Sequence, residues 1–154
     1  MEEGEHLVST AQLRQDERRN LDLARVLLVD DELASRLTLQ TLLEAGGYSV
    51  DVAASAAEGL DKLDEQEYEL VLTDLHKEFA GVGPELLAYA RVKAYKPATA
   101  LVTAYQDSKS FPAPFLDEHE VSVQTEDVAN LLGKVAGLIS LRAARRAERA
   151  VRQG

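Results

Sequence analysis

The chain has 154 residues, contains no cysteine and carries a formal net charge of −10 at pH 7. The lack of cysteine excludes disulfides and thiolate metal sites. The negative charge argues against binding of nucleic acid or an acidic membrane by the whole protein. No segment has the length of a membrane span, and residues 1–5 lack the basic start of a signal peptide, so we expect a cytoplasmic protein.

The first predicted strand follows a polar N-terminal segment. Residues 1–23 are polar and charged, and we expect them to form a flexible extension. An apolar run from Val26 to Val29 then ends in the carboxylates Asp30, Asp31 and Glu32. Because this run is apolar on both faces, it predicts a buried parallel strand. Open α/β sheets bind their ligands at the C-terminal ends of such strands.

Helices and strands alternate after this strand. Apolar residues at helical spacing predict three helices, over 32–45, 56–63 and 83–94. The first is expected to end at Gly46–Gly47, and the Ser55–Glu58 capping box marks the start of the second. Apolar or alternating runs predict strands over 48–52, 70–74 and 99–103. These spacings suit right-handed βαβ crossovers, and they predict a doubly wound α/β fold with a parallel sheet.

The C-terminal part of the chain is less regular. Pro112 and Pro114 cannot lie inside a regular helix, so we expect an irregular or shortened fourth helix. Residues 121–123 suit a short fifth strand, and Thr125 caps a strongly apolar final helix. We expect one domain over 24–141, followed by an Arg-rich helical extension over 142–154 and no output module.

The ends of three predicted strands carry polar side chains. If the strands are parallel neighbours, Asp30, Asp31, Asp74 and Thr103 converge on one edge of the sheet. Each group alone has a simpler explanation, because Asp31 and Glu32 favour a helix dipole and Asp74 can cap a loop. Together they predict a site, since adjacent carboxylates repel each other unless a cation intervenes, and oxygen ligands suit Mg²⁺. A carboxylate beside such an ion can also attack phosphorus.

Three short motifs carry a resemblance to a known family. Val29–Glu32, Leu72–Asp74 and Val102–Ala104 resemble, in order and spacing, the receiver domain of two-component response regulators. The similarity covers about Arg25 to Leu141. It implies a flavodoxin-like, five-stranded parallel sheet with strand order 2-1-3-4-5.

The resemblance also implies roles for individual residues. Asp74 would accept a phosphoryl group from a sensor histidine kinase or a phosphotransfer protein. Asp30, Asp31 and Asp74 would hold Mg²⁺ together with the backbone carbonyl of His76, and Thr103 would sense the phosphate. The His76 side chain has a simpler reading, because an isolated loop histidine is usually only solvated.

Two positions depart from the family pattern. The family usually has a lysine followed by proline at the end of the fifth strand, and Gln124 and Thr125 stand there in this chain. An amide donates a hydrogen bond but brings no charge, so Gln124 should stabilise the phosphorylated state less than lysine does. The family usually has an aromatic residue three positions before the lysine, and Val121 stands there in this chain.

The leading functional hypothesis is a single-domain response regulator that signals through protein contacts to a downstream target. It would be no enzyme beyond its own phosphorylation and dephosphorylation at Asp74. The first alternative is a phosphorylation-independent pseudo-receiver scaffold, which Gln124 and Val121 favour. A phosphatase of the haloacid dehalogenase type is less favoured, because that family has its aspartates two residues apart and Asp30 and Asp31 are adjacent.

The Arg-rich extension has several readings. A solvated helix end is slightly favoured, because cations at a helix C-terminus interact well with the dipole. Binding of an acidic partner or a second copy comes next, so a homodimer is conceivable from the sequence, and nucleic acid ranks well below both.

Overall fold

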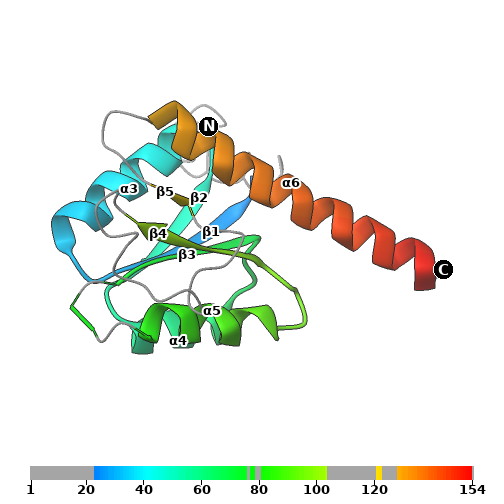
Figure 1. Cartoon of the computed structure of the whole chain (residues 1–154), viewed down its shortest axis with the longest axis horizontal. Helices are drawn as coiled ribbons and strands as arrows, with labels where there is room; N and C mark the ends of the chain where they lie inside the picture. Colours follow the sequence, from blue (N-terminus) through cyan, green and yellow to red (C-terminus); the bar gives the residue numbers. More distant parts are fainter. Residues whose placement is uncertain (1–22, 76, 79–80, 104–120, 123–127, 154) are drawn as a thin grey trace, which may run out of the picture.

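We describe the protein from a computed structural model. The described residues are 23–75, 77–78, 81–103, 121–122 and 128–153. They form the following elements in chain order (Figure 1): β1 Arg25–Asp30, α3 Leu33–Ala45, β2 Ser49–Ala53, α4 Ala56–Glu65, β3 Leu70–Asp74, α5 Val82–Arg91, β4 Ala98–Thr103, β5 Val121–Ser122 and α6 Val128–Gln153. The predicted alternation of strand and helix is therefore present from β1 to β4.

The strands form a parallel sheet with the order β2-β1-β3-β4-β5. The doubly wound α/β fold and the order of the first four strands are confirmed. β5 pairs Val121 with Val102 and Ser122 with Thr103, so it adds only two residues to the edge beside β4. The predicted irregular fourth helix around Pro112 and Pro114 lies outside the described residues. The predicted extension over 1–23 also lies outside them, apart from residue 23.

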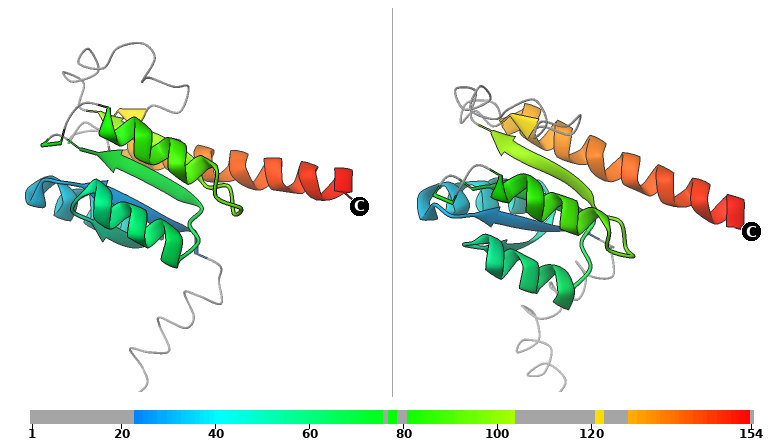
Figure 2. Two further views of the ribbon diagram at one scale, coloured as in Figure 1. Left: turned by 90° about the horizontal axis from the view of Figure 1, so that it is seen from below. Right: turned by 60° about the horizontal axis from the view of Figure 1, so that its bottom comes forward.

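The core lies on both faces of the sheet. Figure 1 shows α3 and α6 on one face and α4 and α5 on the other, and Figure 2 shows the same layers from two further sides. Alternate residues of β1 point to opposite faces, so Val26 and Leu28 pack in one cluster while Leu27 and Val29 pack in the other. All four are completely buried, which explains why the sequence of this strand is apolar throughout.

Local signals set the start of α4 and the end of α3. The Ser55 hydroxyl accepts a 3.1 Å bond from the Glu58 amide, and the Glu58 carboxylate accepts a 3.0 Å bond from the Ala54 amide. These bonds confirm the capping box. The left-handed stop after α3 lies at Gly47, with φ +98°.

The end of α5 differs from the sequence prediction. The helix ends at Arg91, whereas the sequence predicted a helix to residue 94, and Ala94 is exposed in the following turn. The backbone turns there because the amides of Val92 and Lys93 bond to the carbonyls three residues earlier, which tightens the last turn. Leu86, Leu87 and Ala90 lie on the buried face of the helix.

The final helix continues well past the sheet. Leu131 and Val135 of α6 are buried against the core, whereas the residues from Ala143 to Arg152 are exposed. In Figure 1 this part of α6 projects from the body of the molecule. The Arg142 side chain anchors the helix at the point of departure, with bonds of 2.9 Å to the Lys96 carbonyl and 2.7 Å to the Tyr95 carbonyl. Among the described residues, no helix combines the length and apolarity that a membrane crossing needs.

Candidate functional site: the carboxylate edge

Asp30 and Asp74 lie side by side at the C-terminal ends of β1 and β3. They are register partners in the sheet, and both are buried, with 0% and 7% of their surface exposed. Two carboxylates of like charge in this position repel each other, and a cation or a proton shared between them relieves the repulsion. The structure thus brings together the two aspartates that the strand pattern selected.

A serine hydroxyl connects the two carboxylates. Ser35 Oγ lies 2.6 Å from Asp30 Oδ2 and 3.1 Å from Asp74 Oδ2. A hydroxyl has one proton to donate, so it serves only one of the two carboxylates at a time. Ser35 sits in the first turn of α3, which begins just after β1 ends, and this short connection is what places it over the strand ends.

Asp30 is held by further contacts. The Glu32 amide donates a 2.9 Å bond to Asp30 Oδ1, and Arg36 Nη1 donates a 2.8 Å bond to the Asp30 main-chain carbonyl. The Arg36 guanidinium therefore fixes the backbone at the end of β1. Neither Ser35 nor Arg36 was predicted from the sequence as a site residue. A hydroxyl residue one turn into the helix after an acidic strand end is the signal that would have indicated Ser35.

Asp31 connects the end of β1 to the loop after β3. Its Oδ2 atom accepts a 2.6 Å bond from the Lys77 amide and a 3.3 Å bond from the Glu78 amide. Glu78 in turn accepts a 3.3 Å bond at Oε1 from the Ala56 amide at the start of α4. Its Oε2 atom is buried and has no hydrogen-bond partner among the described residues. Glu78 is thus a half-buried acidic neighbour of the site that the sequence did not reveal.

The donor atoms suit a hard cation. Asp30 and Asp74 offer carboxylate oxygens on adjacent strands, and Mg²⁺ binds to one or two carboxylates while it keeps several waters. Within the part of the chain that the structure describes, however, no group of three or more acidic or histidine side chains is placed to hold a metal ion. The Oδ2 atom of Asp31 accepts hydrogen bonds from the amides of Lys77 and Glu78. The chemistry of the donor set fits Mg²⁺.

The other predicted site residues are only partly described. The backbone of Thr103 ends β4 at the same edge of the sheet and pairs with Ser122, but its side chain lies outside the described structure. His76, Gln124 and Thr125 also fall outside the described residues. Their assigned roles therefore stay predictions.

Comparison with known proteins identifies the class of protein that this fold and site define. Residues 26–115 match the response regulator receiver domain family. This match covers more than half of the chain, so the chain belongs to the response regulator receiver domain family. The resemblance seen in the three sequence motifs is confirmed, and with it a place in two-component signal transduction. Receiver domains of this family are typically phosphoacceptors rather than enzymes.

Solved structures show the same fold. A CheY-like receiver domain protein from Methanospirillum hungatei is 28% identical, with a TM-score of 0.65 over 80% of this chain and 98% of that chain. The response regulator TrrA from Thermotoga maritima, crystallised in complex with Mg²⁺-BeF, is 29% identical. Its TM-score is 0.63 over 75% of this chain and 99% of its own.

Curated relatives are much longer than this chain. The transcriptional regulatory protein ZraR of Escherichia coli K12 is 35% identical over 83 residues, which are 52% of this chain and 18% of ZraR. The sensory/regulatory protein RpfC of Xanthomonas campestris is 42% identical over 52 residues, which are 34% of this chain and 7% of RpfC. The chain thus spans less than a fifth of the length of these relatives.

Proposed function

We propose that this chain is a response regulator receiver that accepts a phosphoryl group on Asp74 in the presence of Mg²⁺. The observation that carries the proposal is the pairing of Asp30 and Asp74 at adjacent strand ends, with Ser35 between them. The donor would be a sensor histidine kinase or a phosphotransfer protein, and the output would be a changed contact with a downstream protein.

The transfer is a nucleophilic substitution at phosphorus. An Asp74 carboxylate oxygen forms a bond to phosphorus while the bond from phosphorus to the donor's imidazole nitrogen breaks, and the released imidazole nitrogen takes up a proton. Ser35 and the sheet register hold Asp74 in place beside Asp30. Asp30, Asp31, Asp74 and the His76 carbonyl would hold Mg²⁺, which when bound offsets the charge of the transferring phosphoryl group.

Gln124 and Thr103 determine how strongly phosphorylation of Asp74 shifts the conformation of the domain. In this proposal the Thr103 hydroxyl hydrogen-bonds a phosphoryl oxygen, and the Gln124 amide takes the position where the family usually has a lysine. The amide supplies a neutral hydrogen bond, which is about half as strong as one from an ammonium group. We therefore expect phosphorylation to occur and the switch that follows it to be weaker than in receivers that have the lysine.

The second candidate is a pseudo-receiver that works as a binding scaffold without phosphorylation. Two observations favour it. Gln124 and Val121 replace the residues that usually respond to the phosphate, and the Asp31 Oδ2 atom accepts hydrogen bonds from the loop amides of Lys77 and Glu78. The phosphatase alternative gains no support from the family match, and we do not propose it.

Intact mass spectrometry after brief incubation with acetyl phosphate and Mg²⁺ separates the two candidates. We expect the parent and the control variant Asp61→Asn, which removes an exposed carboxylate on α4, to gain one phosphoryl group. Asp74→Ala should gain none. If a folded parent shows no gain, the scaffold function replaces our proposal.

A further inference from the structure

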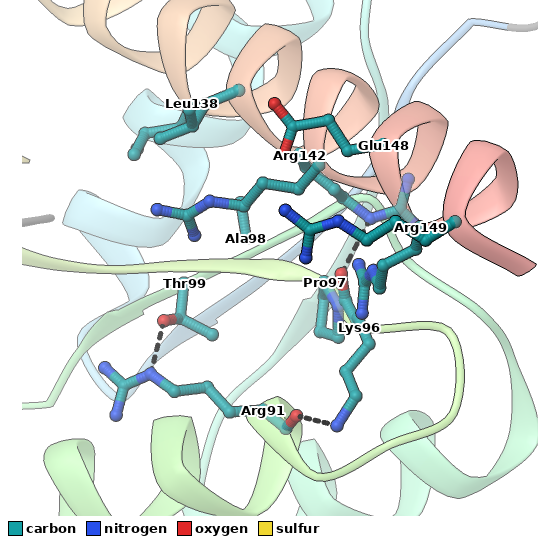
Figure 3. Close-up of a pocket in the computed structure, with 12 residues that line it drawn as sticks. Arg91, Lys96, Pro97, Ala98, Thr99, Leu138, Arg142, Glu148 and Arg149 are labelled. Atoms are coloured by element: carbon teal, nitrogen blue, oxygen red, sulfur yellow. Dashed lines mark hydrogen bonds between the residues drawn. The ribbon is translucent and has the colours of Figure 1, made fainter.

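A cleft with a strongly basic lining lies at the end of the sheet opposite to the carboxylates. It has a volume of about 390 Å³ and lies between the α5–β4 loop and the projecting part of α6 (Figure 3). β4 connects the two regions, because Ala98 and Thr99 at its start line the cleft and Thr103 ends the strand at the carboxylate edge. We call this site the basic cleft, and its cationic lining residues are Arg91, Lys96, Arg142, Arg145, Arg149 and Arg152.

The two walls of the basic cleft are joined by specific contacts. Arg142 of α6 donates to the carbonyls of Tyr95 and Lys96, which fastens the helix to the loop. Lys96 has a φ of +47°, a left-handed conformation that glycine adopts more readily than any other residue. Its ammonium group donates a 3.2 Å bond to the Arg91 carbonyl. The loop therefore keeps a cation at a position where its backbone favours glycine.

Arg142, Arg145, Arg149 and Arg152 follow the three- and four-residue spacing that places side chains on one face of a helix. Glu148 is the one carboxylate among the lining residues. An ion pair joins Lys93 to Asp64, and among the described residues none involves Arg145, Arg149 or Arg152. Burial lowers the pKa of Arg142, the charge of Arg146 lowers it further, and Glu69 opposes this change. Arg145, Arg149 and Arg152 thus lie on one face of α6 without an ion pair among the described residues, so their charges are available to a ligand.

The lining also has an apolar part. Pro97, Ala98, Leu138 and Leu141 contribute to it, and the volume falls in the range of about 300–1,000 Å³ that is usual for small-molecule sites. Six cations around such a volume call for a ligand of high charge density. Phosphate groups provide this density, and guanidinium groups bind them with paired hydrogen bonds. Carboxylates of an extended peptide are spaced by about 3.3–3.6 Å per residue along the chain and supply it less well.

We propose that the basic cleft binds a small anion that carries at least two linked phosphate groups, with a planar or apolar part against Pro97 and Leu138. A nucleoside triphosphate has this chemistry. The site is independent of phosphoryl transfer at Asp74, because its lining residues come from the end of α5, the α5–β4 loop, the start of β4 and α6, and none lies at the carboxylate edge.

The charge distribution argues for a compact ligand rather than a polymer. The whole chain has 17 basic and 27 acidic residues, and six of the basic ones line the cleft, so the rest of the chain is strongly acidic. A long nucleic acid or an acidic membrane would meet this acidic surface, whereas a small anion contacts only the cleft. Part of the charge, that of Arg91 and Lys96, also lies on the wall across the cleft from α6 (Figure 3), where a small ligand can touch both walls.

Titration calorimetry with ATP in the presence of EDTA tests the proposal in the full chain. We expect saturable one-to-one binding that weakens by about tenfold in Arg145→Ala and again in Arg149→Ala. Arg146→Ala removes the same charge from the same helix but lies outside the cleft lining, and it should bind ATP almost as the parent does. Asp74→Ala should also bind normally, so failure of the proposed phosphorylation would leave this result unchanged.

Two further probes define the ligand. Pyrophosphate that binds as tightly as ATP would support recognition of the phosphates and assign no role to the apolar part. A single-stranded oligonucleotide is the second probe. The proposal would be overturned in favour of nucleic acid if the parent protein bound the oligonucleotide more tightly than ATP and if Arg145→Ala and Arg146→Ala weakened oligonucleotide binding equally. No saturable binding of ATP or pyrophosphate, in a protein shown to be folded, would also overturn it.

Discussion

The two ends of the sheet differ in how their charges are held. At the carboxylate edge, Asp30 and Asp74 are buried and each is contacted by Ser35, so the positions of the charges follow from sheet register. At the basic cleft, Arg145, Arg149 and Arg152 are exposed on a projecting helix, whereas Arg142 is tied to the loop. The first arrangement suits chemistry at a fixed point. The second suits capture of a charged ligand by side chains that adjust to it.

This difference also explains what the sequence could predict. Strand ends are marked by a change from apolar to acidic residues, and parallel pairing then places Asp30 beside Asp74 without any further information. The capping box at Ser55 is equally local, because the bonds span four residues or fewer. Features that depend on short-range pairing or on alternation in the sheet were therefore predictable.

Contacts between distant segments were not predictable in the same way. Arg142 meets the Lys96 carbonyl across 46 residues, and Asp31 meets the Lys77 amide across the same separation. The sequence predicted that the arginines of α6 form a solvated helix end or a partner site. No sequence pattern indicated that the α5–β4 loop lies opposite to them. Ser35 was missed for a different reason, because a serine inside a helical run carries no signal until the strand end beneath it is known.

The largest effect should come from Asp30→Asn, which removes one negative charge from the carboxylate edge and leaves the size of the side chain almost unchanged. Phosphoryl uptake from acetyl phosphate should fall by about a hundredfold, because Mg²⁺ loses a carboxylate. In EDTA the variant should unfold at a higher temperature than the parent, since one of two repelling carboxylates is gone. Uptake at the parental rate would contradict a role for Asp30 in the site, and Asp61→Asn serves as the control in both assays.

Gln124→Lys asks whether the carboxylate edge lacks only a cation. The added ammonium group should raise the phosphorylated fraction at steady state by about fivefold, because a charged hydrogen bond to the phosphoryl group replaces a neutral one. Intact mass spectrometry in acetyl phosphate and Mg²⁺ gives this fraction directly. Gln124→Met, which has a similar size and no charge, should not reproduce the gain. An equal gain in both variants would show that charge is not the cause.

Ser35→Ala removes the hydroxyl that the two buried carboxylates share. We expect the free energy of unfolding to fall by about 1 kcal/mol. The loss should be larger in EDTA than in Mg²⁺, since a bound cation compensates the carboxylates. Chemical denaturation in the two buffers measures both values, and Ser35→Thr, which keeps a hydroxyl, should retain most of the stability. Equal losses in the two buffers would argue that Ser35 does not act through the carboxylate pair.

Lys96→Gly tests the basic cleft, because it should raise the stability of the protein and lower its affinity for ATP. Glycine accepts the φ of +47° without strain, so the variant should be more stable than the parent by about 0.5–1 kcal/mol. It should bind ATP several-fold more weakly, because one cation of the cleft is lost. Lys96→Ala should lose the binding without gaining the stability. Unchanged ATP binding in both variants would remove Lys96 from the site.

The most direct test of the central claim is to locate the phosphoryl group in the chain. After treatment with acetyl phosphate and Mg²⁺, borohydride reduces an aspartyl phosphate to the corresponding alcohol, and peptide mass spectrometry then identifies the residue. Our account predicts reduction at Asp74 in the parent protein and in Arg145→Ala, with no reduced aspartate when acetyl phosphate is omitted. Reduction at Asp30 or Asp31 in place of Asp74, or at no aspartate in a folded and Mg²⁺-loaded protein, would contradict it.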